Sequence, residues 1–265
     1  MLIEQGLFGT IDKVQMAIDR IKTFEPPEGY YVATSFGKDS VSVMDLVKRS
    51  GVKADYHYNV TGIDPPELYR FGKKTFPFVQ FHRSEMTMWQ LIVKKRMPPT
   101  RMVRYCCEYL KERGGSGRVV VTGIRWAEST RRSKRRMHEA CFKDNRKLYF
   151  NPIIDWSDSD VWDYIHQNNV PYCSLYDEGF KRLGCILCPM SRNRIKEAER
   201  WPRFVALYRK AIDRCVEKRL TDGLTTDRRG NEFRHKWSTG AEMWDWWLNA
   251  EDRGKEDPDQ SVMFE

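Results

Sequence analysis

The sequence predicts an α/β fold in which a parallel, twisted sheet carries helices on both faces, with a helical extension at the C-terminus. Three observations support this prediction. Short apolar runs alternate with amphipathic helical patterns along the first two thirds of the chain. The length of 265 residues suits one large domain, or one domain with an appendage. From about residue 195 the pattern becomes helical and rich in Trp and Arg. We therefore expect an α/β domain over residues 1–194 and a helical extension over 195–265.

The elements of the α/β domain follow from apolar spacing and from the turn residues between the runs. In order, we expect a helix at about 11–23, a strand at 30–34, a helix after residue 40, a strand at 54–60, a helix at 67–74, short strands at 78–81 and 119–123, an extended piece at 149–154 and a helix at 157–168. The tail after Glu251 is charged, and we expect it to be mobile.

Composition restricts the class of protein. Lys and Arg total 46 against 37 Asp and Glu, which gives a net charge of +9 and favours a polyanionic partner. No apolar run reaches the roughly 20 residues of a membrane span, and the N-terminus lacks a signal-peptide pattern. We therefore expect a cytoplasmic protein that makes no membrane contact. Seven cysteines in a reducing compartment indicate metal binding, catalysis or burial in preference to a disulfide framework.

The stretch SFGKDS joins the predicted strand 30–34 to a helix. Such a junction directs backbone N–H groups and the positive end of the helix dipole at one point, which suits a phosphate group. Glycine lets the backbone approach a ligand, lysine adds a positive charge and the serines add hydroxyl donors. The residues concerned are Ser35, Phe36, Gly37, Lys38, Asp39 and Ser40. The alternative is an ordinary helix start that Asp39 or Ser40 caps.

Two more loops, TGIDPP (61–66) and TGIRWAES (122–129), also follow predicted strands. Because the carboxyl ends of parallel strands share one edge of a sheet, we expect the three loops to form one crevice. The candidate residues in these two loops are Thr61, Gly62, Gly123, Arg125 and Ser129. A dense cationic run follows: Arg131, Arg132, Lys134, Arg135 and Arg136. This run faces either anionic phosphates or solvent.

Four cysteines occur in two tight pairs, Cys106–Cys107 and Cys185-x-x-Cys188. Such pairs suit zinc, an iron–sulfur cluster or a redox couple. Adjacent side chains diverge, so the doublet suits a cluster of several irons better than one tetrahedral zinc. The alternative for the doublet is simple burial. Three further cysteines are isolated, and we expect them to be packing residues: Cys141, Cys173 and Cys215.

These pieces together resemble a known family. SFGKDS resembles the PP-loop of the ATP pyrophosphatases (adenine nucleotide α-hydrolases), and TGIDPPELY resembles a stretch of the adenylylsulfate and phosphoadenylylsulfate reductases. The segment from Asn151 to Pro189 looks very like the matching part of those reductases, and the four cysteines look like the motif that holds a [4Fe–4S] cluster in the adenylylsulfate-type branch.

The resemblance implies an adenine nucleotide α-hydrolase-like, Rossmann-like fold. It also implies that residues 35–40 bind ATP, adenylylsulfate or phosphoadenylylsulfate with Mg²⁺, and that Lys38 and Arg125 stabilise charge during phosphoryl transfer. By the same resemblance, Gly123, Arg125 and Ser129 lie in an arginine-bearing loop of the same site. Asp64 or Glu67 would help to place a metal ion or the ribose.

One departure from the reductases affects the expected reaction. Those enzymes use a cysteine in a C-terminal tail as nucleophile, but this chain has no cysteine after Cys215. The chain is therefore more similar to the cluster-bearing ATP pyrophosphatases that insert sulfur into DNA backbones (phosphorothioation) or tRNA bases. Expected partners are nucleic acid and a cysteine desulfurase or other subunits of a sulfur system. Four C-terminal tryptophans either contribute to a nucleic-acid surface or pack between helices: Trp237, Trp244, Trp246 and Trp247.

Two alternatives remain open. The chain could be a sulfonucleotide reductase whose nucleophile is Cys141 or Cys173. It could also be a non-catalytic nucleotide-binding subunit of a larger assembly. The sequence does not indicate the sulfur donor or the oligomeric state.

Overall fold

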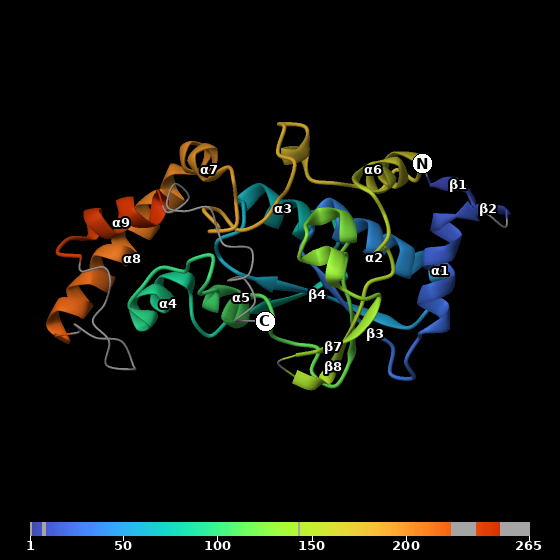
Figure 1. Ribbon diagram of the computed structural model, residues 1–265, viewed down its shortest axis with the longest axis horizontal. Coiled ribbons are helices and arrows are strands. Elements are labelled where there is room, and N and C mark those ends of the chain that lie inside the picture. The colour runs from blue at the N-terminus through green and yellow to red at the C-terminus, as the bar shows by residue number, and fades with distance from the viewer. Residues whose placement is uncertain (1, 7–8, 143, 224–236, 250–265) are drawn as a thin grey trace. The chain divides into compact units, whose positions relative to one another are not determined.

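The structure, a computed structural model, describes residues 2–6, 9–142, 144–223 and 237–249. Its central feature is a six-stranded sheet with the strand order β5-β4-β3-β6-β8-β7 (Figure 1). The strands β4, β3, β6 and β8 run parallel, and β7 pairs antiparallel to β8 at one edge. This arrangement, with helices on both faces and further helices at the C-terminal end, confirms the predicted α/β class. The expected charged tail after Glu251 lies outside the described residues.

The strands of the central sheet have the following bounds: β3 (Tyr30–Thr34), β4 (Ala54–Val60), β5 (Gln80–Arg83), β6 (Val119–Val121), β7 (His138–Cys141) and β8 (Asp144–Phe150). A separate two-stranded antiparallel sheet near the N-terminus consists of β1 (Ile3–Gly6) and β2 (Gly9–Asp12). The central strands β3 and β6 are buried and rich in Val and Tyr, as expected where helices cover a parallel sheet.

The α-helices are α1 (Lys13–Thr23), α2 (Lys38–Ser50), α3 (Pro66–Thr75), α4 (Met88–Lys95), α5 (Tyr105–Leu110), α6 (Asp158–Gln167), α7 (Arg194–Arg200), α8 (Pro202–Thr221) and α9 (Gly240–Leu248). Three short 3₁₀-helices, η1 (Trp126–Glu128), η2 (Arg132–Lys134) and η3 (Ser174–Tyr176), lie in connecting loops. Helix α2 packs against α1, against α6 and against strand β3. Helix α6 starts with a capping box, in which the Ser157 hydroxyl accepts the backbone N–H of Asp160 and the Asp160 carboxylate accepts that of Ser157.

Most predicted elements are present, with three clear differences. The strand expected at 78–81 is β5 at Gln80–Arg83, and Phe78 lies in the turn before it. The extended piece expected at 149–154 is the end of β8 followed by a turn, because β8 begins earlier as the second strand of a hairpin with β7. The first helix begins at Lys13, because Asp12 accepts hydrogen bonds from the backbone N–H groups of Val14 and Gln15 and so acts as the N-cap.

The chain divides into two compact units. Unit 1 contains residues 1–60, 64–82 and 113–184, and unit 2 contains residues 61–63, 83–112 and 185–265. This division differs from the expected boundary at residue 194, because both cysteine pairs group with the C-terminal helices. Compact units of this kind do not test where domains begin and end, so the division into domains 1–194 and 195–265 stays a prediction.

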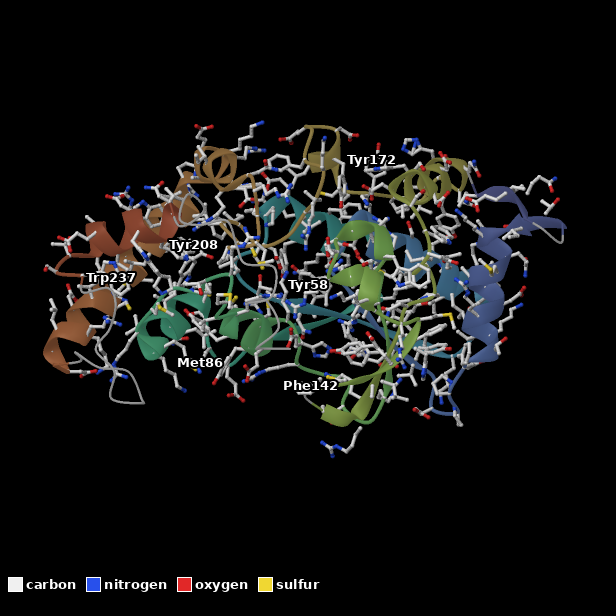
Figure 2. The ribbon with its side chains drawn as sticks, in the orientation of Figure 1. Tyr58, Met86, Phe142, Tyr172, Tyr208 and Trp237 are labelled. Carbon is white, nitrogen blue, oxygen red and sulfur yellow. The ribbon has the colours of Figure 1, made fainter. Side chains whose placement is uncertain are left out.

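Unit 2 is helical, and its core is aromatic. Helix α8 packs along both α4 and α9. The ring of Tyr208 in α8, which is labelled in Figure 2, contacts Trp89 of α4 and Trp247 of α9, with ring centroids 4.9 and 5.0 Å away. Trp244 and Trp247 are buried, so for these two residues the packing alternative is correct. Among the described helices, none combines the length and the apolar character that crossing a bilayer requires.

Candidate nucleotide and cysteine sites

The loop between β3 and α2 has a fixed and strained backbone. Phe36 has a φ of 57°, a left-handed conformation that is costly for a bulky residue. Its side chain is fully buried, and its ring packs against the rings of Tyr58, Phe76 and Phe81. Gly72 lies so close that a Cβ there would stand 2.2 Å from the Phe36 ring. This aromatic packing stabilises the turn before any ligand binds.

Hydroxyl groups hold the rest of the loop. The Ser40 hydroxyl donates to the carbonyl of Gly37 at 2.9 Å, and it accepts the backbone N–H of Ser35 at 3.3 Å. The hydroxyl of Thr34 accepts the backbone N–H of Phe36 at 3.1 Å. Ser40 is buried and Ser35 is exposed. The structure therefore uses Ser40 to shape the loop, while the exposed Ser35 hydroxyl lies 3.4 Å from the Ser40 hydroxyl and can turn to a ligand.

Helix α2 begins at Lys38 without a side-chain cap. The N-cap residue is Gly37, which has no side chain that could accept the N–H groups of the first turn. The alternative of an ordinary helix start capped by Asp39 or Ser40 is therefore wrong. The first turn of α2 keeps backbone donors and the positive end of the helix dipole at the point where a phosphate group is expected.

Four charges alternate in sign beside this helix start. Lys38 Nζ lies 3.2 Å from Asp39 Oδ1 and 2.8 Å from Asp158 Oδ1. Arg125 donates to the same two oxygens, from Nε at 2.6 Å and from Nη2 at 2.5 Å, and its Nη1 donates to the carbonyl of Trp156 at 3.0 Å. Burial alone would raise the pKa of Asp158, but hydrogen bonds from Lys38 and Arg125 outweigh burial and lower it. Two cations and two carboxylates thus form a four-charge ring.

Arg125 is only 1% exposed. Burial would lower the pKa of its guanidinium, yet Asp39 and Asp158 raise it, so the side chain stays charged. Each of its three nitrogens donates to a protein acceptor. In this structure Arg125 supports the carboxylates around Lys38, and a direct contact with a phosphate stays a prediction.

Gly123 and Tyr176 complete the surroundings of the loop. A Cβ built on Gly123 would lie 2.9 Å from both the carbonyl carbon and the oxygen of Asp39, so only glycine fits against the start of α2. The Tyr176 hydroxyl accepts the backbone N–H of Lys38 at 2.9 Å. A phosphate that binds to this N–H has to displace the phenol.

Other predicted positions are less closely tied to this loop. Thr61 and Gly62 belong to unit 2, where the Thr61 hydroxyl accepts the N–H of Ile63 at 3.1 Å. Ser129 is exposed, and its hydroxyl accepts the N–H of Arg132 at 3.2 Å. The part of these three residues in nucleotide binding stays a prediction. In the cationic run, Arg132 and Arg135 pair with glutamates, Glu128 and Glu139 respectively, so neither is simply a free solvated cation.

The four paired cysteines all belong to unit 2, and all are partly buried. Cys106 and Cys107 open helix α5, while Cys185 and Cys188 flank a tight turn. In that turn Leu187 has a φ of 57°, and its N–H donates to a carboxylate oxygen of Glu197 at 2.7 Å. This bond holds the Cys-x-x-Cys turn in place.

The charge states of the doublet are unequal. A hydrogen bond from Cys106 lowers the pKa of Cys107 to about 5, against the effect of burial, and Arg104, which donates at 3.3 Å, lowers it further. The same bond and burial raise the pKa of Cys106, as do Cys107, Cys185 and Cys188. The four sulfurs therefore lie within electrostatic range of one another. Among the described residues, no three His, Cys, Asp or Glu side chains are gathered tightly enough to bind a metal ion together.

A family comparison agrees with this geometry. The model of the phosphoadenosine phosphosulfate reductase domain matches residues 29–191, which is more than half of the chain and includes the loop, the four-charge ring and all four paired cysteines. The chain belongs to the phosphoadenosine phosphosulfate reductase domain family.

Relatives of this reductase-domain chain differ in length and name. An uncharacterized protein of Methanocaldococcus jannaschii is 31% identical over 206 residues, which covers 70% of this chain and 48% of that protein. The chain therefore spans about half the length of this relative. The adenosine 5′-phosphosulfate reductase of Oceanobacillus iheyensis is 30% identical over 189 residues, covering 64% of this chain and 75% of the relative.

One solved structure shows the same fold. The phosphoadenylyl-sulfate reductase of Candida auris, solved as a phosphate complex, superposes with a TM-score of 0.50 at 18% identity, covering 64% of this chain and 87% of that one. At this identity the likeness supports the reductase-domain fold alone.

Several residues of the candidate sites escaped the sequence reasoning. Asp158 was expected only as part of an acidic first turn of α6, and Tyr176 was part of a long motif without an assigned role. Glu197 and Arg104 contact the cysteine segments but have no spacing signal of their own. A charge count could have suggested Asp158, since two predicted site cations need counter-charges. Nothing local marks the other three.

The chemistry of the donors fits the groups that the family resemblance implies. Four thiols from one unit, one of them already favoured as thiolate, match the ligand set of an iron–sulfur cluster. Asp39 and Asp158 offer the hard oxygen atoms that Mg²⁺ prefers. Mg²⁺ commonly takes only one or two carboxylates and obtains its remaining ligands from phosphates and water.

Proposed function

We propose that this protein is an ATP-dependent sulfur-transfer enzyme, which activates an acceptor oxygen by adenylation at the Ser35–Ser40 loop before sulfur replaces that oxygen. The observation that carries the proposal is the start of α2. The N-cap Gly37 has no side chain to cap the first turn, and the Lys38 N–H is held by the Tyr176 hydroxyl, which a phosphate can displace. The Lys38 side chain begins at the same point, and buried aromatic packing holds the preceding turn. This is the arrangement that a phosphate chain requires.

The reaction would have two steps. The acceptor oxygen attacks the α-phosphorus of ATP, a new O–P bond forms, pyrophosphate leaves, and the acceptor proton passes to solvent. A sulfur nucleophile at the oxidation level of sulfide then replaces the adenylated oxygen and AMP leaves, with no net oxidation or reduction. Lys38 would bind the phosphate oxygens, while Arg125 would hold Asp39 and Asp158 in place around it.

The iron–sulfur cluster and Mg²⁺ would bind to different residues. Cys106, Cys107, Cys185 and Cys188 would hold a [4Fe–4S] cluster, which when bound supplies electron-transfer and sulfur-carrying chemistry. Arg104 would stabilise the negative charge of the thiolates. Mg²⁺ would arrive with the nucleotide and use Asp39 or Asp158 as protein ligand. A cysteine desulfurase or another sulfur-system subunit would deliver the sulfur as a persulfide, and an external dithiol would supply the two electrons that bring it to the level of sulfide. Nucleic acid is the acceptor that the charge of the chain favours.

A second candidate is a sulfonucleotide reductase, because relatives about 30% identical carry the name adenosine 5′-phosphosulfate reductase. That reaction needs a thiol to take the sulfur from the substrate. Cys173 is 1% exposed, and burial raises the pKa of its thiol, so it is poorly suited as a nucleophile. Cys141 is half-buried near the hydroxyl of Tyr149. The nucleophile of such a reductase would therefore be either Cys141 or an external thiol.

The test compares two reactions of anaerobically purified protein. We expect pyrophosphate release from ATP in the presence of nucleic acid, and loss of at least 99% of it in Lys38→Ala and Lys38→Met. Lys48→Ala, an exposed lysine on the same helix, is the matched control and should keep the activity. Unchanged release in both Lys38 variants would exclude the role of the loop. Sulfite release from adenylylsulfate with a thiol donor would instead support the reductase. Tight ATP binding without either reaction would support a binding subunit.

A further inference from the structure

Trp126 differs from every other tryptophan of the chain. All nine tryptophans lie in the described residues, and Trp126 is the only exposed one, with 44% of its surface accessible. It opens η1, directly after Arg125 of the four-charge ring. A single exposed apolar side chain is common at a protein surface, so a binding role for Trp126 depends on how its ring is held and on the charges near it in the chain.

The position of the Trp126 ring is fixed. Its indole N–H donates to the carbonyl of Arg135 at 2.7 Å, and its backbone N–H donates to the carbonyl of Ile154 at 2.8 Å. The segments η1 and η2 pack against each other. Arg135 is held in turn by Glu139 and lies over the ring of Tyr149, 5.7 Å from its centroid. The indole is thus a rigid surface that needs no ordering when a partner binds.

Two exposed positive charges lie next to Arg135 in the chain. Lys134 and Arg136 are the chain neighbours of Arg135, whose carbonyl binds the indole, and both are exposed. In the described part of the chain neither has an acidic partner, whereas Arg132 and Arg135 do. We call Trp126, Lys134 and Arg136 the Trp126 platform.

We propose that the Trp126 platform binds single-stranded nucleic acid, with a base stacked on the indole and adjacent phosphates on Lys134 and Arg136. An exposed aromatic ring beside unpaired cations has the chemistry of single-strand binding, because every base offers a ring face and every linkage an anion. Duplexes suit it less well, since their base faces are covered. This inference rests on the proposed function, for which it names single-stranded nucleic acid as the acceptor. Because Trp126 follows Arg125, a bound strand would pass beside the nucleotide loop, which belongs to the same unit.

Two of the four C-terminal tryptophans are unsuited to base stacking, whereas the part of Trp237 and Trp246 in a nucleic-acid surface stays a prediction. Trp244 and Trp247 are 2% and 1% exposed and fill the core of unit 2, so they have no face on which a base could stack. The overall positive charge is compatible with many surfaces. Because the 126–136 segment combines a fixed ring with unpaired cations, we choose it as the nucleic-acid surface.

The experiment measures binding of a short fluorescein-labelled oligothymidylate to the full chain by anisotropy, without nucleotide. We expect Trp126→Ala to bind about five-fold more weakly or worse, and Trp126→Phe to keep most of the affinity. Phe142→Ala is the matched control, since Phe142 is 87% exposed at the tip of the β7–β8 hairpin of the same unit (Figure 2). Replacing both Lys134 and Arg136 by Ala should reduce the slope of log K against log salt by about 0.7 per lost phosphate contact.

The proposal is overturned if wild type and Trp126→Ala bind the strand equally well, if Phe142→Ala loses as much affinity as Trp126→Ala, or if wild type does not bind single strands. Preferred binding of a duplex that survives Trp126→Ala would also exclude it. Circular dichroism and thermal unfolding of each variant exclude misfolding as the cause. The proposed function fails separately: if strands bind through the platform but ATP yields no pyrophosphate, then the surface stands and the reaction does not.

Discussion

The nucleotide loop of unit 1 and the cysteine site of unit 2 are built in different ways. The loop is a continuous stretch between one strand and one helix, and its unusual Phe36 backbone is fixed by packing and by hydroxyls within a few residues. The cysteines come from two segments far apart in the chain, one at the start of a short helix and one in a turn. The loop is therefore ready before its ligand arrives, whereas four neighbouring thiols gain most from a bound metal group.

Their charges show the same contrast. In the loop, two cations face two carboxylates, so the protein itself neutralises each charge. At the cysteines, Arg104 and the Cys106 thiol stabilise one thiolate, and the remaining sulfurs raise the pKa of Cys106. If all four cysteines were ionised, their charges would need positively charged metal ions for balance. We therefore expect the loop to keep its conformation without a nucleotide, and the cysteine site to need its metal group to stay ordered.

The largest expected effect is on the cysteine site. Anaerobically purified wild type should contain about four irons and four acid-labile sulfides per chain if the proposed cluster is present. Cys107→Ser should lose them entirely, because a serine hydroxyl is a hard and weakly acidic ligand. Cys141→Ser is the control and should keep the metal. Zinc, or no metal in wild type, would contradict the cluster while leaving the loop unaffected.

Gly123→Ala should give the next largest effect, and this time in unit 1. The new methyl group would stand 2.9 Å from the Asp39 carbonyl and would push the start of α2 away. Overpacking of this kind costs about 1–3 kcal/mol, so we expect ATP affinity to fall about ten-fold or more. Isothermal titration gives the affinity. Gly184→Ala, where a Cβ meets nothing within 4 Å, should bind ATP like wild type. If Gly123→Ala and Gly184→Ala bind ATP equally well, the close approach of Gly123 to Asp39 does not affect nucleotide binding.

The smallest effect is expected at Asp158, whose carboxylate forms an ion pair with Lys38 at 2.8 Å. Its side chain is 75% exposed, so the ion pairs with Lys38 and Arg125 are worth only about 0.5–1 kcal/mol. Asp158→Asn should therefore tighten ATP binding a few-fold, because the phosphate no longer competes with a carboxylate. Asp163→Asn on the same helix should change nothing. Weaker binding in Asp158→Asn would indicate that this carboxylate holds Mg²⁺ instead.

The pH dependence at Asp158 has a definite sign. Hydrogen bonds lower its pKa below the ordinary value near 3.9, so the pairs with Lys38 and Arg125 are present at neutral pH. They are lost only as pH falls through that lower value. Between about pH 5 and 8 the effect of Asp158→Asn on ATP affinity should stay constant, and a marked change across this window would assign the competition to another group.

The sequence was sufficient for features that depend on near neighbours. Strand β4 has the predicted bounds, and the strand–loop–helix junction at 34–38 was expected from one glycine and two flanking patterns. The left-handed Phe36 was not predicted, since its conformation depends on rings from residues 58, 76 and 81. The partnership of Asp158 with Lys38 is likewise a long-range contact that no periodicity reveals.

The same limit explains the tryptophans and the grouping of the cysteines. Composition suggested an aromatic nucleic-acid surface near the C-terminus, but burial depends on which helices pack together, and Trp244 and Trp247 face a core. The chain order placed Cys106 and Cys107 in the α/β domain. In the structure, packing groups them with α8 and α9 instead. Sequence spacing therefore pointed to four paired thiols, whose common role stays a prediction, but it did not indicate which unit contains them.

The way in which the chain alternates between its two units restricts how this protein can be divided or inherited. The path changes unit after residues 60, 63, 82, 112 and 184, so no single cut yields an intact α/β unit or an intact cysteine unit. A recombination event could not exchange the cysteine unit as one contiguous cassette. Fragments made by truncation at residue 184 would carry the doublet without the Cys-x-x-Cys turn. The two sites are therefore expected to be gained, lost and expressed together, as parts of a single gene segment.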